Sequence, residues 1–489
     1  MSDPKPERLT LGIDLGTSAV KVVALGTDDA VMGEGAAGFG TDTTLPQQAE
    51  QQTADWLQAA SRAMHALAGG MKDSLGTQWT QQVAAIGLTG QLPTLVCLDD
   101  AKPLGAAITW KDGRADTWAS ARVDTARRTL MYARTGMPID GRYLAPMLQY
   151  HFADRIGAVR TILSAKDYLL YELTGQRLTE PSTAAGYGIY DLQKRRFSED
   201  LADFWHLPRA LLPGIRGANT LAGPLNHAGA ALLGLREGLP VSTGAADSVC
   251  ASFAMAGLDE RVVSISFGSS AVVIGASAAA RLDAAARYLL TPHVNDDWYG
   301  REMDLLASGT GYRWLSDLFM WNDGDIDRYA AQSVPGANGL CFPPYLAGGE
   351  QGALWNPRLQ GALFGLSLRH SRADIARAFL EGVFFEIKRC IEVLAETAPI
   401  DAVMISGNLV HSPSSTQMLA DILHRAVGAV PGRSPAALGA AMLARRIAGV
   451  DDEFDRRPWS RPLIKPDESS AHEYAGLYRR YLARAARCE

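Results

Sequence analysis

The sequence contains few cysteines and no long apolar run. Its five cysteines lie far apart and are odd in number, so neither a disulfide framework nor a paired-cysteine metal site is expected. No stretch approaches the roughly 20 uninterrupted apolar residues that a membrane-spanning helix requires. The polar start MSDPKPERLT also lacks the apolar core of a signal peptide. These absences predict a reduced, cytoplasmic protein with no membrane partner.

The sequence also has fewer basic than acidic residues. Lys and Arg total 47 against 53 Asp and Glu, which gives a net charge of −6, and no basic run stands out. A nucleic-acid partner is therefore not expected. The 489 residues are 47% apolar and 20% charged, a composition that excludes disorder, collagen and coiled coil. The length suggests two large or three smaller globular units.

Two segments have the pattern of a β-hairpin closed by glycine and small hydroxyl residues. In residues 9–25, apolar residues alternate with others on both sides of Gly16-Thr17-Ser18. Residues 261–274 repeat this design around Gly268-Ser269-Ser270. Each hairpin is followed later by a short apolar run that ends in glycine and polar residues, at 84–91 and at 402–409. The repeated order predicts two related lobes that meet near residue 256.

Amphipathic helices are expected between these strands. Ser371 and Asp374 have capping-box spacing before a long apolar stripe, and Ser412-Pro413 is typical of a second helix start. Residues 456–466 are expected to wrap over the surface before a last helix. Strands that alternate with helices predict an α/β fold.

The two hairpin turns are candidate phosphate sites. Consecutive backbone N–H groups can point at an anion where glycine allows a close approach, and small hydroxyls add donors. The chain has no G-x-x-x-x-G-K-[ST] loop, so a Walker A site is excluded. One such turn by itself favours a plain hairpin, whereas two in one chain could hold a polyphosphate from both sides.

Asp247 lies between an apolar strand and an apolar helical stretch. An Asp in that position commonly caps the helix. A glycine three residues before it and a phosphate-hairpin candidate about fifteen residues after it also indicate a catalytic role. In that role the carboxylate would accept a proton from an attacking hydroxyl.

The chain resembles the FGGY family of carbohydrate kinases, in the actin/hexokinase/Hsp70 superfamily, over roughly residues 9–450. The resemblance implies an α/β fold of two actin-like (ribonuclease H-like) lobes with a nucleotide and sugar cleft between them. Residues 1–256 would form the N-terminal lobe with the sugar site and the first phosphate loop. Residues 257–489 would form the C-terminal lobe with the second phosphate loop and the adenosine pocket. Eight motifs in family order carry it: GIDLGTSAVK (12–21), IGLTGQ (86–91), ITWKDGRAD (108–116), SAKDYLLYELTG (164–175), TGAADS (243–248), SISFGSS (264–270), PPYLAGGEQGALWNPRLQGALFGL (343–366) and SGNLVHSPSSTQMLADIL (406–423).

The resemblance also implies roles for single residues in an ATP-dependent phosphorylation of a sugar hydroxyl. Asp247 would be the general base, and Asp14 would help to hold Mg²⁺ beside the ATP. The other nucleotide-binding residues would be Gly16, Thr17, Ser18, Lys21, Gly268, Ser269, Gly309, Gly407, Asn408 and Ser412. The sugar would contact Gln91, Leu92, Pro93, Trp110, Asp112, Asp247 and Ser248. Gln91 could instead cap the strand end, and Trp110 could belong to the core. A homodimer is a possible assembly, because dimers are common among the relatives.

The xylulokinase branch of the family resembles this chain most closely, so D-xylulose, converted to D-xylulose 5-phosphate, is the first candidate substrate. Two positions depart from that branch. Pro93 stands where it usually has a histidine that contacts the sugar, and Ser248 stands where it usually has asparagine. Loss of a buried hydrogen-bond partner can change sugar discrimination by orders of magnitude. Gluconate, ribulose or a pentitol therefore stay open as substrates.

Two functions other than a sugar kinase fit the same frame. A nucleotide-binding regulatory protein would keep both hairpins but would not need the carboxylate of Asp247, which this chain has. An ATP hydrolase would turn over without any sugar. Because Asp247 is present, the sequence favours the kinase.

Overall fold

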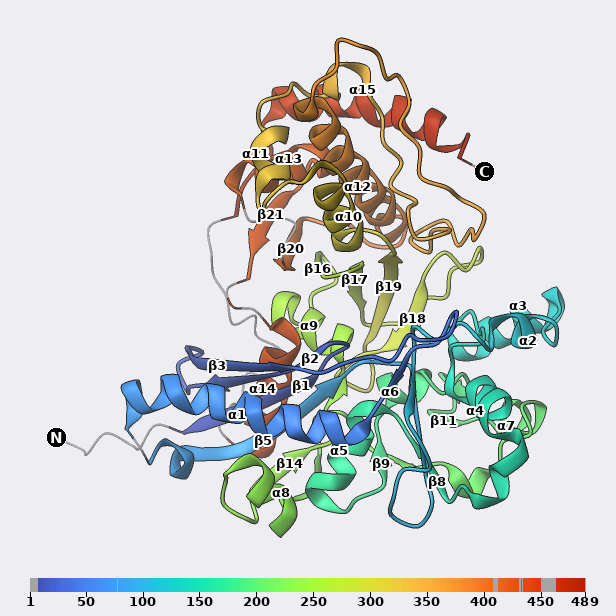
Figure 1. Cartoon of the computed structure of the whole chain (residues 1–489), viewed down its shortest axis with the longest axis vertical. Coiled ribbons are helices and arrows are strands. Elements are labelled where there is room, and N and C mark those ends of the chain that lie inside the picture. Colours follow the sequence, from blue (N-terminus) through green and yellow to red (C-terminus); the bar gives the residue numbers. More distant parts are fainter. Residues whose placement is uncertain are drawn as a thin grey trace.

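The computed structural model describes residues 8–76, 78–407, 412–430, 432, 434–449 and 463–488. These residues form two lobes, each built around one mixed sheet with helices on both faces (Figure 1). The predicted α/β fold of two actin-like lobes is therefore confirmed. Within the described residues, none of the helices has the length and apolar character needed to cross a membrane.

The sheet of the N-terminal lobe has the strand order β13-β14-β5-β1-β2-β3. Strands β1, β2 and β3 form an antiparallel meander. On the other side of β1, β5 pairs in parallel with β1, and β14 pairs in parallel with β5. The short strand β15 also pairs with β5. The strands are β1 (Leu9–Leu15), β2 (Ala19–Leu25), β3 (Val31–Gly38), β5 (Val83–Gly90), β13 (Leu221–Pro224), β14 (Pro240–Ser242) and β15 (Ala245–Ala246).

The sheet of the C-terminal lobe repeats this plan with the order β18-β19-β17-β16-β20-β21. Here β16, β17 and β19 form the antiparallel meander, and β20 and β21 are the parallel additions. The predicted internal repeat is thus a repeat of topology. The strands are β16 (Val262–Phe267), β17 (Ala271–Ser277), β18 (Leu289–Pro292), β19 (Tyr299–Leu305), β20 (Ala402–Gly407) and β21 (Ala426–Ala429).

A third, smaller sheet with the order β4-β7-β6-β8 extends the N-terminal lobe. It carries the loops that hold Gln91 and Trp110. Its strands are β4 (Glu50–Gln51), β6 (Thr94–Leu98), β7 (Ala107–Thr109) and β8 (Thr161–Leu163), and two short pairs complete the set: β9 (Leu178–Thr179) with β12 (Gly214–Ile215), and β10 (Tyr190–Asp191) with β11 (Arg196–Phe197).

Helices cover both main sheets on each side. Helix α1 packs on β2 and β3, and α14 packs on the opposite face of the same sheet (Figure 1). Helices α9 and α12 contact the sheet of the C-terminal lobe. The helices are α1 (Thr53–Leu75), α2 (Asp116–Ser120), α3 (Thr125–Thr135), α4 (Leu144–Phe152), α5 (Ala165–Thr174), α6 (Pro181–Ala185), α7 (Glu199–Phe204), α8 (His227–Leu233), α9 (Asp247–Ala256), α10 (Gly309–Phe319), α11 (Asp325–Ala330), α12 (Arg372–Ala395), α13 (Pro413–Leu423), α14 (Pro435–Ile447) and α15 (Glu468–Ala485).

Helix α14 comes from the C-terminal half of the sequence but packs on β1 and β5 of the N-terminal lobe. Two strand glycines allow this close approach. A Cβ atom added to Gly12 would lie 1.7 Å from the Ala437 carbonyl oxygen, and one added to Gly87 would lie 1.8 Å from that of Ala440. Since real Cβ atoms never come so near to a backbone oxygen, these positions require glycine, and the two lobes interlock through α14.

The predicted helix starts are confirmed. Ser371 and Asp374 form a reciprocal capping box at the start of α12, and the Ser412 side chain accepts a 3.1 Å hydrogen bond from the Ser415 N–H at the start of α13. All five cysteines are buried and have free thiols. The predicted wrapping segment lies mostly outside the described residues, which exclude 450–462.

Candidate active site

The first predicted phosphate turn, Gly16-Thr17-Ser18, joins β1 to β2. The Gly16 N–H donates a 3.1 Å hydrogen bond to the Ala19 carbonyl, which closes the turn. Asp14 lies just before it, opposite Lys21 on β2. Burial raises the pKa of Asp14, while the charge of Lys21 and a hydrogen bond from the Ser434 side chain lower it. The buried Oδ1 atom of Asp14 has no hydrogen-bond partner in the described structure.

A chain of hydrogen bonds connects this turn to two residues predicted for the acceptor site. The Trp110 indole N–H donates to the Thr17 hydroxyl at 3.3 Å. The Gln51 amide donates to the Thr17 carbonyl at 2.8 Å, and its oxygen accepts from Gln91 Nε2 at 2.8 Å. The buried Oε1 atom of Gln91 has no partner in the described structure. Trp110 and Gln91 are therefore held in fixed positions relative to the first turn.

Gln51 was missed by the sequence analysis. It is 2% exposed on β4 and also accepts a 3.0 Å hydrogen bond from the Trp56 indole N–H. It lies in the stretch QQAEQQ, where four glutamines have the same sequence character and only tertiary contacts tell them apart. No local signal could have singled it out.

The second predicted turn, Gly268-Ser269-Ser270, joins β16 to β17 and rests on the start of α10. The Gly268 N–H donates to the Ser270 carbonyl at 2.8 Å, and the Thr310 N–H donates to the Ser269 carbonyl at 2.9 Å. A Cβ atom added to Gly309 would lie 2.1 Å from the Gly268 carbonyl oxygen. Gly309 is therefore required for the contact between helix and turn.

Asp247 is the first residue of α9, and Ala246 occupies the N-cap position. The simple capping interpretation is therefore wrong. Asp247 Oδ1 accepts a 2.8 Å hydrogen bond from the adjacent Ser248 N–H. Burial raises the pKa of Asp247 to about 7, and the negative charge of Asp14 adds to this effect; the Ser248 N–H and Lys21 act in the opposite direction. Asp247 and the first turn thus face a common space.

Two carboxyl groups of β19, Glu302 and Asp304, lie close to Asp247 from the C-terminal lobe. Burial and the neighbouring Asp304 raise the pKa of Glu302 to about 8, although hydrogen bonds from Ser248 and Thr291 lower it. Burial raises the pKa of Asp304 to about 6, against the positive charge of Arg142. We call Asp247, Glu302 and Asp304 the acidic wall. The sequence analysis missed its two β19 members, because they come together with Asp247 only in the folded structure.

Three more residues predicted to contact the sugar, Asp112, Leu92 and Pro93, are at least partly buried. Asp112 is buried, and its carboxylate accepts hydrogen bonds from Arg114 Nη2 at 2.6 Å and from the Ala49 N–H at 2.9 Å. These contacts favour a positioning role over direct contact with sugar. Leu92 and Pro93 are partly buried and joined by a cis peptide bond.

Two of the predicted adenosine residues are described: Gly407 is the last residue of β20, and Ser412 is the N-cap of α13. Gly407 has φ +98°, and a Cβ atom there would lie 1.9 Å from the Phe267 carbonyl oxygen. Ser412 caps α13 and also donates a 3.2 Å hydrogen bond to Asp327. Asn408 lies outside the described residues.

The site chemistry fits a magnesium ion held mainly by substrate and water. In the part of the chain that the structure describes, no cluster of three or more His, Cys, Asp or Glu side chains could hold a metal. Mg²⁺ is commonly bound by one or two carboxylates together with waters and substrate phosphates. Asp14, with its unpartnered buried oxygen beside the first turn, fits that pattern.

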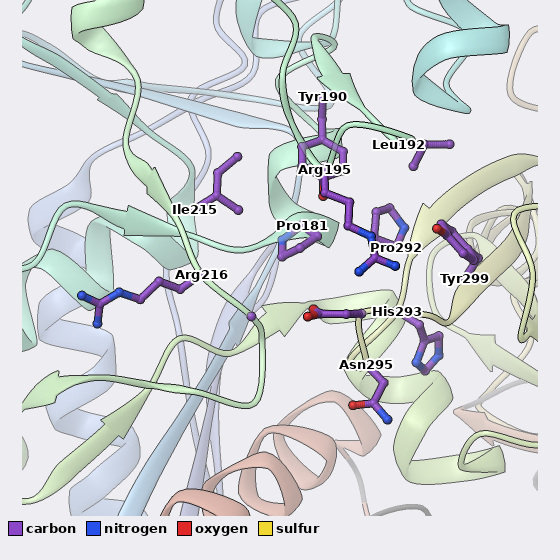
Figure 2. Close-up of a pocket in the computed structure, with 12 residues that line it drawn as sticks. Pro181, Tyr190, Leu192, Arg195, Ile215, Arg216, Pro292, His293, Asn295 and Tyr299 are labelled. Carbon is purple, nitrogen blue, oxygen red and sulfur yellow. The ribbon is translucent and has the colours of Figure 1, made fainter.

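A separate pocket of about 160 Å³ lies between the two lobes, and its lining shares no residue with the predicted site (Figure 2). The β18–β19 hairpin supplies one wall and residues around β10 and β12 supply the other. Figure 2 shows Arg195, Pro292 and Tyr299 close together on one side, while Arg216 points away. The pocket lies at the end of β19 away from Glu302 and Asp304.

Comparisons with known proteins agree with this geometry. Residues 9–254 match the N-terminal domain and residues 263–448 the C-terminal domain of the FGGY family of carbohydrate kinases. The chain is 27% identical to a xylulose kinase of Lactococcus lactis over 91% of this chain and 89% of that protein. It is 26% identical to a gluconokinase of Bacillus licheniformis over 96% of this chain and 93% of that protein.

A solved structure shows the same arrangement of both lobes. The xylulose kinase from Rhodospirillum rubrum superposes with a TM-score of 0.84 at 28% identity, over 98% of each chain. Since the two family models together cover most of the sequence and fit the observed lobes, the chain belongs to the FGGY family of carbohydrate kinases.

Proposed function

We propose that this carbohydrate kinase transfers the terminal phosphate of ATP to a hydroxyl of D-xylulose and forms D-xylulose 5-phosphate. The position of Asp247 carries the proposal. Its Oδ1 atom is held by the Ser248 N–H, and Oδ2 has no hydrogen-bond partner among the described residues. The carboxylate is close enough to Asp14 for the two charges to interact. An acceptor hydroxyl bound to Oδ2 would therefore face a phosphate held at the first turn.

The pKa of Asp247 suits a general base. A base with a pKa near the working pH accepts a proton more readily than an ordinary aspartate and is still substantially ionised. Phosphoryl transfer needs little covalent help from the protein; it requires alignment, charge neutralisation and an oriented nucleophile. Asp247 would orient the hydroxyl and accept its proton as the new P–O bond forms.

ATP would bind with its phosphates between the two turns. Gly16, Thr17, Ser18 and Lys21 would contact them from one side, and Gly268, Ser269 and Gly309 from the other. Asp14 would hold Mg²⁺ through its waters, and when bound the ion supplies positive charge to the phosphate oxygens. Gly407, Asn408 and Ser412 would border the adenosine. This reaction belongs in the cytoplasm, where ATP is available.

The acidic wall favours a neutral ketose over a sugar acid. An acceptor carboxylate would add negative charge next to Asp247 and Asp304, whereas the hydroxyls of D-xylulose can donate hydrogen bonds to these groups. The xylulose kinases among the relatives support the same choice. Ser248, which replaces the usual asparagine, directs its hydroxyl to Glu302. Gluconate is the second candidate, because gluconokinases are also among the relatives.

The experiment is ADP release from Mg-ATP across D-xylulose, D-ribulose, gluconate, glycerol and pentitols, with a sugar-free control. We expect the greatest stimulation with D-xylulose. A larger stimulation with another acceptor would replace the substrate and keep the kinase. ADP release without sugar would indicate a hydrolase, and ATP binding without turnover would indicate a regulatory protein. Asp247→Ala is the matched negative control for each active acceptor.

A further inference from the structure

Lys111 lies beside the first phosphate turn. It follows Trp110, whose indole N–H donates to the Thr17 hydroxyl at 3.3 Å. The ammonium nitrogen of Lys111 lies 5.2 Å from the centre of the Trp110 ring. Since a cation is attracted to the face of an indole, the ring helps to hold the ammonium near the turn.

Arg313 lies beside the second phosphate turn, on the opposite lobe. It belongs to α10, whose Thr310 N–H donates to the Ser269 carbonyl. One turn further along α10, Arg313 Nη2 lies 3.4 Å from the Ser269 hydroxyl and donates to it. Each phosphate turn therefore has an exposed cation next to it, Lys111 at the first turn, in addition to Lys21 of β2, and Arg313 at the second. Lys111 and Arg313 come from different lobes.

The two cations are also close enough to act on each other. Partial removal of water from the otherwise exposed Lys111 side chain lowers its pKa, and repulsion by Arg313 lowers it further. Within the described residues neither side chain forms a salt bridge with a carboxylate. Two like charges brought together across a cleft are unfavourable unless an anion binds between them. The position beside both turns identifies that anion as a phosphate.

We propose that Lys111 and Arg313 bind the terminal phosphate of ATP from opposite lobes and neutralise its charge during transfer. This rests on the proposed kinase function. In the step, the bond between phosphorus and the oxygen bridging to ADP breaks, and a bond from phosphorus to the sugar hydroxyl oxygen forms. The hydroxyl proton moves to Asp247, and both cations keep their protons. Lys supplies a compact charge and Arg a two-pronged donor, which together match the oxygens of a phosphate.

Nucleotide affinity tests the proposal directly. Calorimetry would compare Mg-ADP with the Mg²⁺ complex of AMP-PNP, which carries a non-transferable terminal phosphate, for the wild type, Lys111→Met and Arg313→Met. We expect each variant to bind AMP-PNP about 10-fold more weakly, and ADP with a change below about twofold. Lys102→Met removes an exposed lysine from the turn after β6 and is the matched control, with no change for either nucleotide.

Equal weakening for both nucleotides, or no weakening, would overturn the proposal. Both side chains are exposed, so the variants should fold, and an unchanged melting temperature checks this.

Turnover with the best acceptor separates this inference from the proposed function. We expect kcat to fall about 10- to 100-fold in Lys111→Met and Arg313→Met, and to recover largely in Lys111→Arg and Arg313→Lys. A raised KM for the sugar with unchanged kcat would instead make Lys111 an acceptor contact and overturn the proposal. If no acceptor is phosphorylated but AMP-PNP binding still depends on both cations, the proposed function fails and the phosphate contact stands.

Discussion

The raised pKa of Asp247 predicts a marked pH dependence near neutrality. With a pKa of about 7, the carboxylate is ionised in about one tenth of molecules at pH 6 and in about nine tenths at pH 8. If ionised Asp247 is the base, kcat/KM should rise about tenfold over this interval. An aspartate of ordinary pKa would change its ionised fraction by about 1% over the same interval. The two cases are easily distinguished.

The assay is kcat/KM for Mg-ATP, measured by ADP release with the sugar held below saturation, because this quantity reports the ionisation of the free enzyme. Asp304→Asn removes a charge that raises the pKa of Asp247 and should move the acid limb to lower pH. Asp247→Asn should lose about 10²- to 10⁴-fold in rate and retain ATP binding. A flat kcat/KM between pH 6 and 8, or an Asp247→Asn variant with wild-type turnover, would refute the reasoning.

Three further predictions concern contacts around the site. Gly309→Ala should weaken ATP binding, because its Cβ would lie 2.1 Å from the Gly268 carbonyl, whereas Gly476→Ala in α15 meets open space and should leave binding unchanged in calorimetry. Gln51→Leu should destabilise the fold by about 1–3 kcal/mol in denaturant titrations, since it leaves the buried Trp56 and Gln91 donors without their acceptor, and it should raise KM as the first turn loosens. Glu350→Gln should flatten the pH dependence of the melting temperature, because burial raises the pKa of Glu350 from 4.5 to about 8. Relative to this variant, the wild type is most stable below about pH 4.5 and loses that stability as the pH rises through 8. Equal pH slopes for both proteins would contradict the last prediction.

The elements that could be predicted from the sequence are those with local signals. Alternating apolar residues around Gly16-Thr17-Ser18 and Gly268-Ser269-Ser270 specify hairpins, and the structure has β1–β2 and β16–β17 there. The Ser371 capping box likewise depends on residues four positions apart or fewer. The hairpin followed by a short apolar run occurs twice in the sequence and predicted two related lobes. In the structure the two runs are β5 and β20, and each pairs in parallel with the first strand of its hairpin.

The parts that could not be predicted depend on contacts between distant segments. The motif around Asp112 predicted a carboxylate that contacts the sugar. In the structure its oxygens accept hydrogen bonds from Arg114 and from the Ala49 N–H. Glu302 and Asp304 have the sequence pattern of ordinary strand positions. Burial raises the pKa of both groups, and the charges of Asp304 and Asp247 raise that of Glu302 further, so the effect exists only in the folded structure. Burial and neighbouring charge, which set these pKa values, are not properties of a local sequence pattern.

Helix α14 has a consequence for how the chain folds during synthesis. Strands β1 and β5 leave the ribosome early, yet the helix that covers their glycine face ends at Ile447. Ser434, which caps that helix, also hydrogen-bonds to Asp14. Domains generally fold as units from the N-terminus during translation. This N-terminal lobe, however, can be completed only after most of the chain has been synthesised. The surroundings of Asp14 would therefore be completed only near the end of translation, so a prematurely terminated chain would lack the Ser434 contact to this carboxylate.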